Sequence, residues 1–126
     1  MKDKKNFRQL DLLQDKIREL KEEIYEIEQI NAEDPIERAF IDHLHAWEYV
    51  IFQKNGKRNK SNRIRNAWDE NGIKNVIENM VRKKKTSGLN TLKDRQKTEV
   101  SFETLVVSHR EHFDKNLVEI ALKKLG

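Results

Sequence analysis

The chain has 126 residues, of which 36% are hydrophobic and 38% charged, with one proline, four glycines and a net charge of +4. A chain of this length and composition can form one helix-rich domain with a hydrophobic core and one extended element, and widespread disorder is not expected. The absence of cysteine excludes disulfides, thiol chemistry and cysteine-based zinc sites.

Residues 7–31 are predicted to form a long amphipathic helix. Its apolar residues recur with alternating steps of three and four, as in a coiled coil; they are Leu10, Leu13, Ile17, Leu20, Ile24 and Ile27. We take residues 1–33 as an N-terminal helix and candidate dimerisation element, and residues 34–126 as a helical domain with a basic surface. No apolar stretch here suits a signal peptide or a membrane span, so we expect a cytoplasmic protein without a membrane partner.

The charged residues beside this stripe favour an antiparallel pair of helices over a parallel pair. In a parallel homodimer Lys16 would face Lys21 of the other copy, and Glu23 would face Glu28. In an antiparallel dimer Lys16 faces Glu23 twice, and each such surface pair contributes about 0.3–0.5 kcal/mol. The alternative is that this helix packs on other helices of its own chain.

The second predicted helix begins near residue 35 and ends at Asn55-Gly56. Asp34 and Glu37 match the Asp-x-x-Glu capping box, and Pro35 suits the first turn. The predicted apolar face consists of Ile36, Phe40, Leu44, Trp47 and Ile51. A basic loop, residues 57–60, follows this helix.

Two short amphipathic segments come next, joined by Asn71-Gly72. Ser61 is expected to cap the first, whose apolar residues are Ile64, Ala67 and Trp68. The second matches the helical template closely, with Ile73, Val76, Ile77, Met80 and Val81 on one face. A capped helix followed by two helices with a tight break resembles a helix-turn-helix arrangement, over about residues 35–85. The long loop at 53–60 departs from the compact versions of that arrangement, and no family signature accompanies it.

The C-terminal part has weaker signals. Residues 86–98 are predicted to be a loop, and residues 99–110 fit either a strand or a helix capped by Ser101; we favour the helix. A small β-hairpin near 89–107 is the alternative. Asp114 is expected to cap the last helix, with Phe113 and Val118 as a hydrophobic staple. The predicted fold class is all-α: a coiled-coil-like N-terminal helix followed by a compact multi-helix domain with a helix-turn-helix-like pair.

Positive charge is concentrated in residues 54–97, which contain fourteen Lys or Arg and four Asp or Glu, whereas residues 19–37 are acidic. A dense basic block favours a polyanionic partner, so we expect a nucleic-acid-binding protein. DNA is preferred over RNA, and duplex DNA in particular, on the helix-turn-helix pattern alone. The candidate binding residues are Lys57, Arg58, Lys60, Arg63, Arg65, Lys74, Asn75, Asn79, Arg82, Lys83, Lys84 and Lys85.

These candidates are expected to act in two ways. The cations of the loop and the first short helix would hold phosphates. Asn75, Asn79 and Arg82 share one stripe of the second short helix, and asparagine and arginine are residue types that read adenine and guanine edges in a groove.

Other function classes also fit the sequence. Charge runs are often only solvated surface, and Trp47 and Trp68 are predicted to lie in the core rather than to stack on bases. A protein–protein interaction module, such as a small inhibitor or adaptor of a nucleic-acid enzyme, would use the same charge segregation. His109 and His112 stand one turn apart but do not form an HExxH motif; a metal-dependent nuclease is the third alternative. We favour a non-enzymatic protein without a metal or cofactor.

Overall fold

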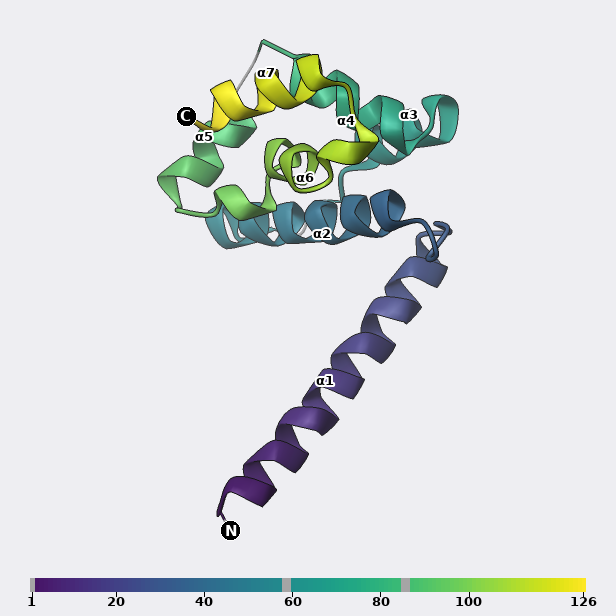
Figure 1. The fold of residues 1–126 in the computed structure, drawn as a ribbon, viewed down its shortest axis with the longest axis vertical. Coiled ribbons are helices and arrows are strands. Elements are labelled where there is room, and N and C mark those ends of the chain that lie inside the picture. The colour runs from purple at the N-terminus through teal and green to yellow at the C-terminus, as the bar shows by residue number, and fades with distance from the viewer. Residues whose placement is uncertain (1, 58–59, 85–86) are drawn as a thin grey trace. The chain divides into compact units, whose positions relative to one another are not determined.

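The structure is a computed structural model of the 126-residue chain. It describes residues 2–57, 60–84 and 87–126, with the side chains of 9–57, 60–84 and 88–126. All regular structure in these residues is helical, which confirms the predicted all-α class (Figure 1). The chain forms two compact units, residues 1–38 and residues 39–126.

The first unit is built on α1 (Lys2–Ile27), which starts and ends earlier than the predicted helix. Gln29 has a left-handed φ of 58°, and the Ile30 amide donates to the Tyr25 carbonyl at 3.2 Å. This is a Schellman ending, in which glycine usually occupies the left-handed position. Because glutamine stands there instead, the sequence does not mark the end of the helix.

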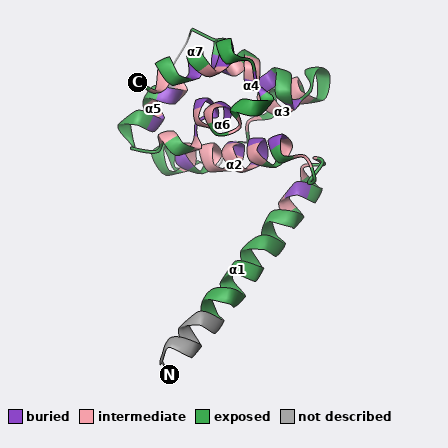
Figure 2. Ribbon diagram, viewed as in Figure 1, coloured by how far each residue is buried: buried purple, intermediate pink, exposed green. Residues whose placement is uncertain are grey.

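Five of the six apolar residues of the α1 stripe are exposed and Ile24 is half-buried; Figure 2 shows that most of the described part of the helix is exposed. Leu20 is 45% exposed, Leu13 60% and Ile27 74%. Soluble monomers rarely leave a long contiguous apolar surface open to water. The stripe is therefore a candidate interaction surface.

Helix α2 (Pro35–Asn55) begins with the predicted cap. One carboxylate oxygen of Asp34 accepts hydrogen bonds from the amides of Ile36, at 2.8 Å, and Glu37, at 3.4 Å. In a full capping box the Glu37 carboxylate would accept a hydrogen bond from the Asp34 amide. Here it accepts one from the Asn31 amide instead, at 3.4 Å. The helix start is thus fixed by side chains that the sequence pattern identified.

Helices α3 (Asn62–Asn71) and α4 (Ile73–Arg82) follow each other with only Gly72 between them. Gly72 has a φ of 86°, and its amide donates to the Trp68 carbonyl at 2.8 Å. A residue with a side chain is strained at such a φ, so glycine permits this tight break. The consecutive helices are consistent with the predicted helix-turn-helix arrangement.

Residues 87–126 contain one helix that the sequence did not predict. Helix α5 (Ser87–Asp94) and the 3-10 turn η1 (Thr98–Val100) occupy the predicted loop. The loop prediction is therefore wrong for residues 87–94 and 98, residues 95–97 are non-helical, and residue 86 lies outside the described residues. The alternative hairpin near 89–107 is also wrong, because the described residues there form no strand. The buried residues of α5 are Leu89 and Leu92, and two apolar positions are too few to give a periodicity signal.

Helix α6 (Phe102–Ser108) confirms the helical interpretation of residues 99–110. The Ser101 hydroxyl accepts a hydrogen bond from the Thr104 amide at 3.1 Å, which is the predicted cap. A second 3-10 turn, η2 (Arg110–His112), leads into α7 (Lys115–Leu125). Asp114 stands at the start of α7, but its side chain makes no capping hydrogen bond.

The core of the second unit lies around α6, with α2 on one side and α4 and α7 on the other (Figure 1). The Phe40 ring is 5.5 Å from the Phe102 ring and meets Trp68 edge-on at 5.4 Å. Such aromatic contacts add about 0.5–1.5 kcal/mol beyond area burial. The largest fully buried side chains are those of Phe40, Ile41, Leu44, Ile77, Leu105 and Leu117.

His43 is a titratable group in this core, and it makes stability depend on pH. Its Nδ1 lies 2.9 Å from the Val100 carbonyl oxygen, and its ring lies 6.5 Å from that of Phe102. Burial lowers the pKa of His43, against the opposing effects of Val100 and Asp42, and His109 lowers that pKa further. The folded protein therefore holds fewer protons on this ring than the unfolded chain does.

We expect the free energy of unfolding to be highest above the unfolded-state pKa of about 6.5. It should decrease as the pH falls below that value, by at most about 1.4 kcal/mol per pH unit from this group. Urea unfolding at about pH 7.5 and about pH 5.5 measures the difference. His43→Gln should remove most of the difference in unfolding free energy between the two pH values. If the difference were unchanged in this variant, it would arise from other groups.

Candidate nucleic-acid interface

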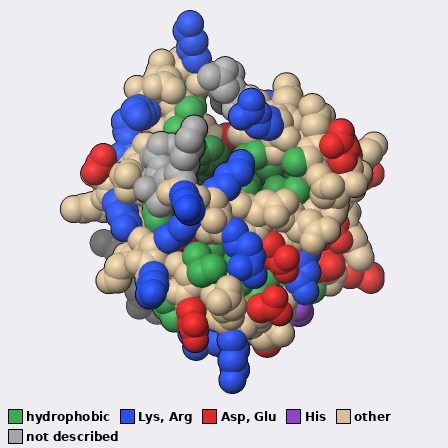
Figure 3. Space-filling model, turned by 90° about the horizontal axis from the view of Figure 1, so that it is seen from above, with side chains coloured by type: hydrophobic (Ala, Val, Ile, Leu, Met, Phe, Trp, Pro, Cys, Tyr) green, Lys and Arg blue, Asp and Glu red, His purple; other side chains and the backbone are tan. Residues whose placement is uncertain are grey.

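The structure describes ten of the twelve residues predicted to bind nucleic acid; Arg58 and Lys85 lie outside the described residues. Nine of the ten are exposed: Lys57, Lys60, Arg63, Lys74, Asn75, Asn79, Arg82, Lys83 and Lys84. Figure 3 shows lysine and arginine side chains around a hollow in which hydrophobic side chains are visible. Most of the acidic side chains in that view lie toward its right and lower edges.

Arg65 is placed differently from the other nine. Its two terminal nitrogens donate to the two carboxylate oxygens of Glu48 on α2, at 3.0 and 3.1 Å, and the side chains are only 13% and 14% exposed. The same carboxylate accepts from the Ser61 amide at 2.8 Å. A bidentate pair shielded from water fastens helices together, so Arg65 attaches α3 to α2 and is not free to hold a phosphate.

Two residues on the outer face of α4 contact the region of α7. The Lys74 ammonium lies 5.8 Å from the centre of the Phe113 ring, which is a cation–π distance. Arg82 donates to the Asn116 side-chain oxygen at 3.1 Å. Both cations are still exposed, but part of their bonding capacity is used within the protein.

The two asparagines of the predicted groove-reading stripe differ from each other. Asn75 donates its side-chain amide to the Asn71 carbonyl at 2.7 Å, so one of its two donors is committed to the α3–α4 break. Asn79 lines a cavity. The stripe therefore does not present one uniform set of free amides.

A lysine from α7 fixes the end of α4. The Lys124 ammonium donates to the carbonyls of Val81 and Lys83, where a cation compensates the negative end of the helix dipole. This contact joins residues 41 and 43 positions apart, so no local pattern predicts it. It holds the backbone that carries the exposed Lys83 and Lys84.

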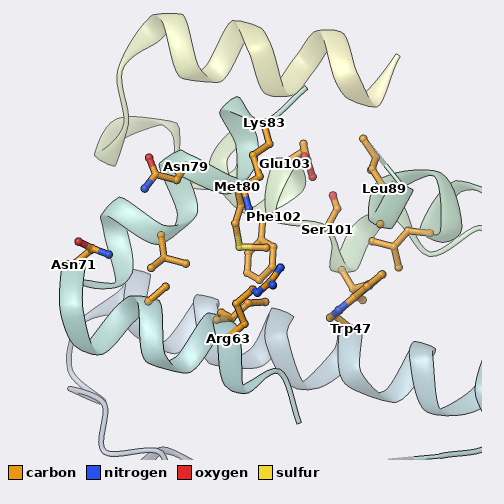
Figure 4. Close-up of a pocket in the computed structure, with 16 residues that line it drawn as sticks. Trp47, Arg63, Asn71, Asn79, Met80, Lys83, Leu89, Ser101, Phe102 and Glu103 are labelled. Atoms are coloured by element: carbon orange, nitrogen blue, oxygen red, sulfur yellow. The ribbon is translucent and has the colours of Figure 1, made fainter. Parts of the chain in front are cut away.

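A cavity of about 440 Å³ opens between α2, α3, α4, α5 and the start of α6 (Figure 4). The apolar residues of its wall include Trp47, Ile64, Val76, Met80, Leu89, Leu92 and Phe102. Its polar lining consists of Arg63, Asn71, Asn79, Lys83, Ser101 and Glu103. Three predicted binding residues thus border the same cavity: Arg63 on α3, Asn79 on α4 and Lys83 directly after α4.

His109 and His112 each contact a nearby residue of their own segment. The His109 ring nitrogen lies 3.0 Å from the Leu105 carbonyl, and His112 lies 3.7 Å from the carboxylate of its neighbour Glu111. In the described residues no group of three or more His, Asp or Glu side chains could hold a metal ion. No described helix has the length and apolar character needed to cross a membrane.

Comparison with known protein families, curated proteins and solved structures finds no match to this chain.

Proposed function

We propose that the chain is a non-enzymatic nucleic-acid-binding protein that holds phosphates with exposed cations of α3 and the end of α4, together with Lys57 and Lys60. The observation that supports this most is the position of Arg63 and Lys83. Arg63 lies on α3 and Lys83 directly follows α4; both are exposed, and both border the same cavity. Exposed cations grouped in this way displace the counterions that surround a phosphate backbone. The release of these counterions drives association at low salt.

The arrangement of these cations also supports a polyanion rather than a single phosphate. Lys57, Lys60 and Lys84 are exposed in the segments next to Arg63 and Lys83. Several cations can contact successive phosphates of one strand, and each contact makes binding more dependent on salt. Duplex DNA, which the helix-turn-helix pattern favours, and a strand with unpaired bases are both ligands of this kind.

Fluorescence anisotropy with labelled random-sequence DNA at several salt concentrations tests the proposal. The logarithm of the binding constant should fall linearly with the logarithm of the salt concentration, with a slope of about −0.7 to −0.9 per phosphate contact. Arg63→Glu and Lys83→Glu should each weaken binding about tenfold or more at low salt and make the slope less steep. Arg110→Glu, an exposed arginine on η2 outside the basic block, is the matched control. A wild-type protein that binds no DNA or RNA at low salt would reject the proposal and favour the protein-adaptor alternative.

We further propose that two copies associate through α1 as an antiparallel pair. The exposed stripe of α1 supplies the apolar surface, and the charge pattern supplies the direction. Residues 1–18 carry an excess of basic side chains and residues 19–37 an excess of acidic ones, so antiparallel helices place unlike charges side by side. A dimer would double the number of phosphate contacts available to one nucleic-acid molecule.

A further inference from the structure

Glu103 is a buried carboxylate at the start of α6 that lines the cavity and is only 9% exposed. No hydrogen bond or ion pair joins its carboxylate to another described residue. Its carboxylate oxygens are not among the fully buried unpaired atoms of the described residues, so they are accessible from the cavity that Glu103 lines. A ligand that enters the cavity and donates a hydrogen bond could therefore reach this carboxylate, which accepts none from the described part of the protein.

The apolar wall of the cavity suits a flat ring. Trp47, Met80 and Phe102 come from three different helices and border the cavity together (Figure 4). Trp47 and Met80 are only half-buried, so part of each faces the open space. Aromatic side chains and methionine make favourable contacts with planar rings, and base–aromatic stacking is a general means of holding unpaired bases.

The polar lining excludes a simple apolar ligand. Arg63 and Lys83 are cations, and Asn71 and Asn79 offer amide donors and acceptors. The Ser101 hydroxyl is already bonded to Thr104, at 3.0 Å to its hydroxyl and 3.1 Å to its amide. A ligand that uses all of these groups carries phosphate, a planar ring and a hydrogen-bond donor.

We propose that the cavity receives one unpaired base of a nucleic-acid strand and prefers a base with an exocyclic amine, such as cytosine or adenine. The base lies against Trp47, Met80 and Phe102, its amine donates to the Glu103 carboxylate, and flanking phosphates bind Arg63 and Lys83. Thymine and uracil present a carbonyl oxygen where cytosine presents an amine, and that oxygen is repelled by a carboxylate. The cavity volume of about 440 Å³ lies in the range of about 300–1,000 Å³ usual for ligand pockets.

This inference rests on the proposed function and narrows its ligand to unpaired strands. Bases in a duplex are stacked and must be extruded before they can enter a pocket. A simple organic anion would satisfy the two cations but would leave Glu103 without a donor.

Competition anisotropy with single strands of about 12 nucleotides tests the inference at one low salt concentration. Oligo(dC) and oligo(dA) should bind about tenfold more tightly than oligo(dT) and than an abasic strand with the same number of phosphates. Equal affinity for all four strands would overturn the base site and leave phosphate binding intact. Failure of every strand and of duplex DNA to bind would overturn the proposed function itself.

Two substitutions separate a ligand contact from a structural role. Glu103→Gln should bring the affinities for oligo(dC) and oligo(dT) to within about threefold of each other, because an amide can also donate to the thymine oxygen. A purely structural role for Glu103 would weaken all strands equally and would overturn the proposal.

Ala67→Phe, which adds a ring at the wall of the cavity, should lower the affinity for oligo(dC) to that of the abasic strand while the salt dependence persists. Asn66→Phe, at the exposed neighbouring position on α3, is the matched control. Unchanged oligo(dC) binding by folded Ala67→Phe would overturn the proposal. If circular dichroism shows that Ala67→Phe does not fold, the ratio of the affinities of Glu103→Gln for oligo(dC) and oligo(dT) tests the proposal in its place.

Discussion

Arg65→Glu should destabilise the second unit severely, whereas Arg63→Glu should leave stability almost unchanged and weaken nucleic-acid binding. In the first variant two carboxylates would face each other where the shielded Arg65–Glu48 pair now lies. Loss of one partner from a buried ion pair costs about 3–5 kcal/mol, against a total stability of about 5–15 kcal/mol for a typical domain. Arg63 is exposed, and substitutions at such positions usually change stability by about 0.5 kcal/mol or less.

Urea unfolding followed by circular dichroism, together with anisotropy at low salt, measures both effects. Arg65→Lys serves as an intermediate control, because lysine keeps the charge but cannot form the bidentate contact with Glu48. Its free energy of unfolding should fall between those of the wild type and Arg65→Glu. If Arg65→Glu were as stable as the wild type and had lost binding, Arg65 would be a phosphate ligand and not a structural residue.

The contrast between Arg63 and Arg65 shows where sequence reasoning is limited. The two arginines are two positions apart on one helix, and their local contexts are equally basic. What separates them is Glu48, which lies 17 residues before Arg65 on another helix. A long-range partner of this kind has no periodic signal, so the sequence assigned both arginines the same role.

Features with a local cause were predicted well. The buried residues of α4, namely Ile73, Val76, Ile77 and Val81, follow from a repeat within one helix. The Asp34 and Ser101 caps follow from a side chain bonding to an amide two or three residues later. These patterns need only neighbouring residues, and the all-α class follows from them.

The cavity, in contrast, has no local signature. Its lining comes from α2, α3, α4, α5 and the start of α6, and α5 itself was not predicted. Trp47 was expected in the core, yet it is half-buried and borders the cavity. Glu103 gave no signal in sequence beyond a generic carboxylate, because its burial depends on how the helices assemble.

The isolated chain should sediment as a dimer, and charged substitutions in the α1 stripe should make it monomeric. Ile17→Asp combined with Leu20→Asp would place carboxylates in an apolar helix–helix seam, where an unpaired charge is strongly unfavourable. The side chains at both positions are exposed in the single chain, at 53% and 45%, so these changes should leave helical content unchanged. Analytical ultracentrifugation measures the mass. A wild-type protein that remains monomeric at high concentration would contradict dimerisation through α1.

A single charge reversal distinguishes an antiparallel dimer from a parallel one, because it changes the dimer dissociation constant in opposite directions in the two cases. In an antiparallel dimer Lys16→Glu sets like charges against Glu23 twice, so the dimer dissociation constant should rise about fivefold or more. In a parallel dimer the same change would pair residue 16 with Lys21 of the other copy and strengthen association. Adding Glu23→Lys should restore the affinity only in the antiparallel case.

The chain has no cysteine, so introduced thiols give a second measurement of helix direction. In an antiparallel dimer, Ile17→Cys in one copy should crosslink to Leu20→Cys in the other more readily than to Ile17→Cys.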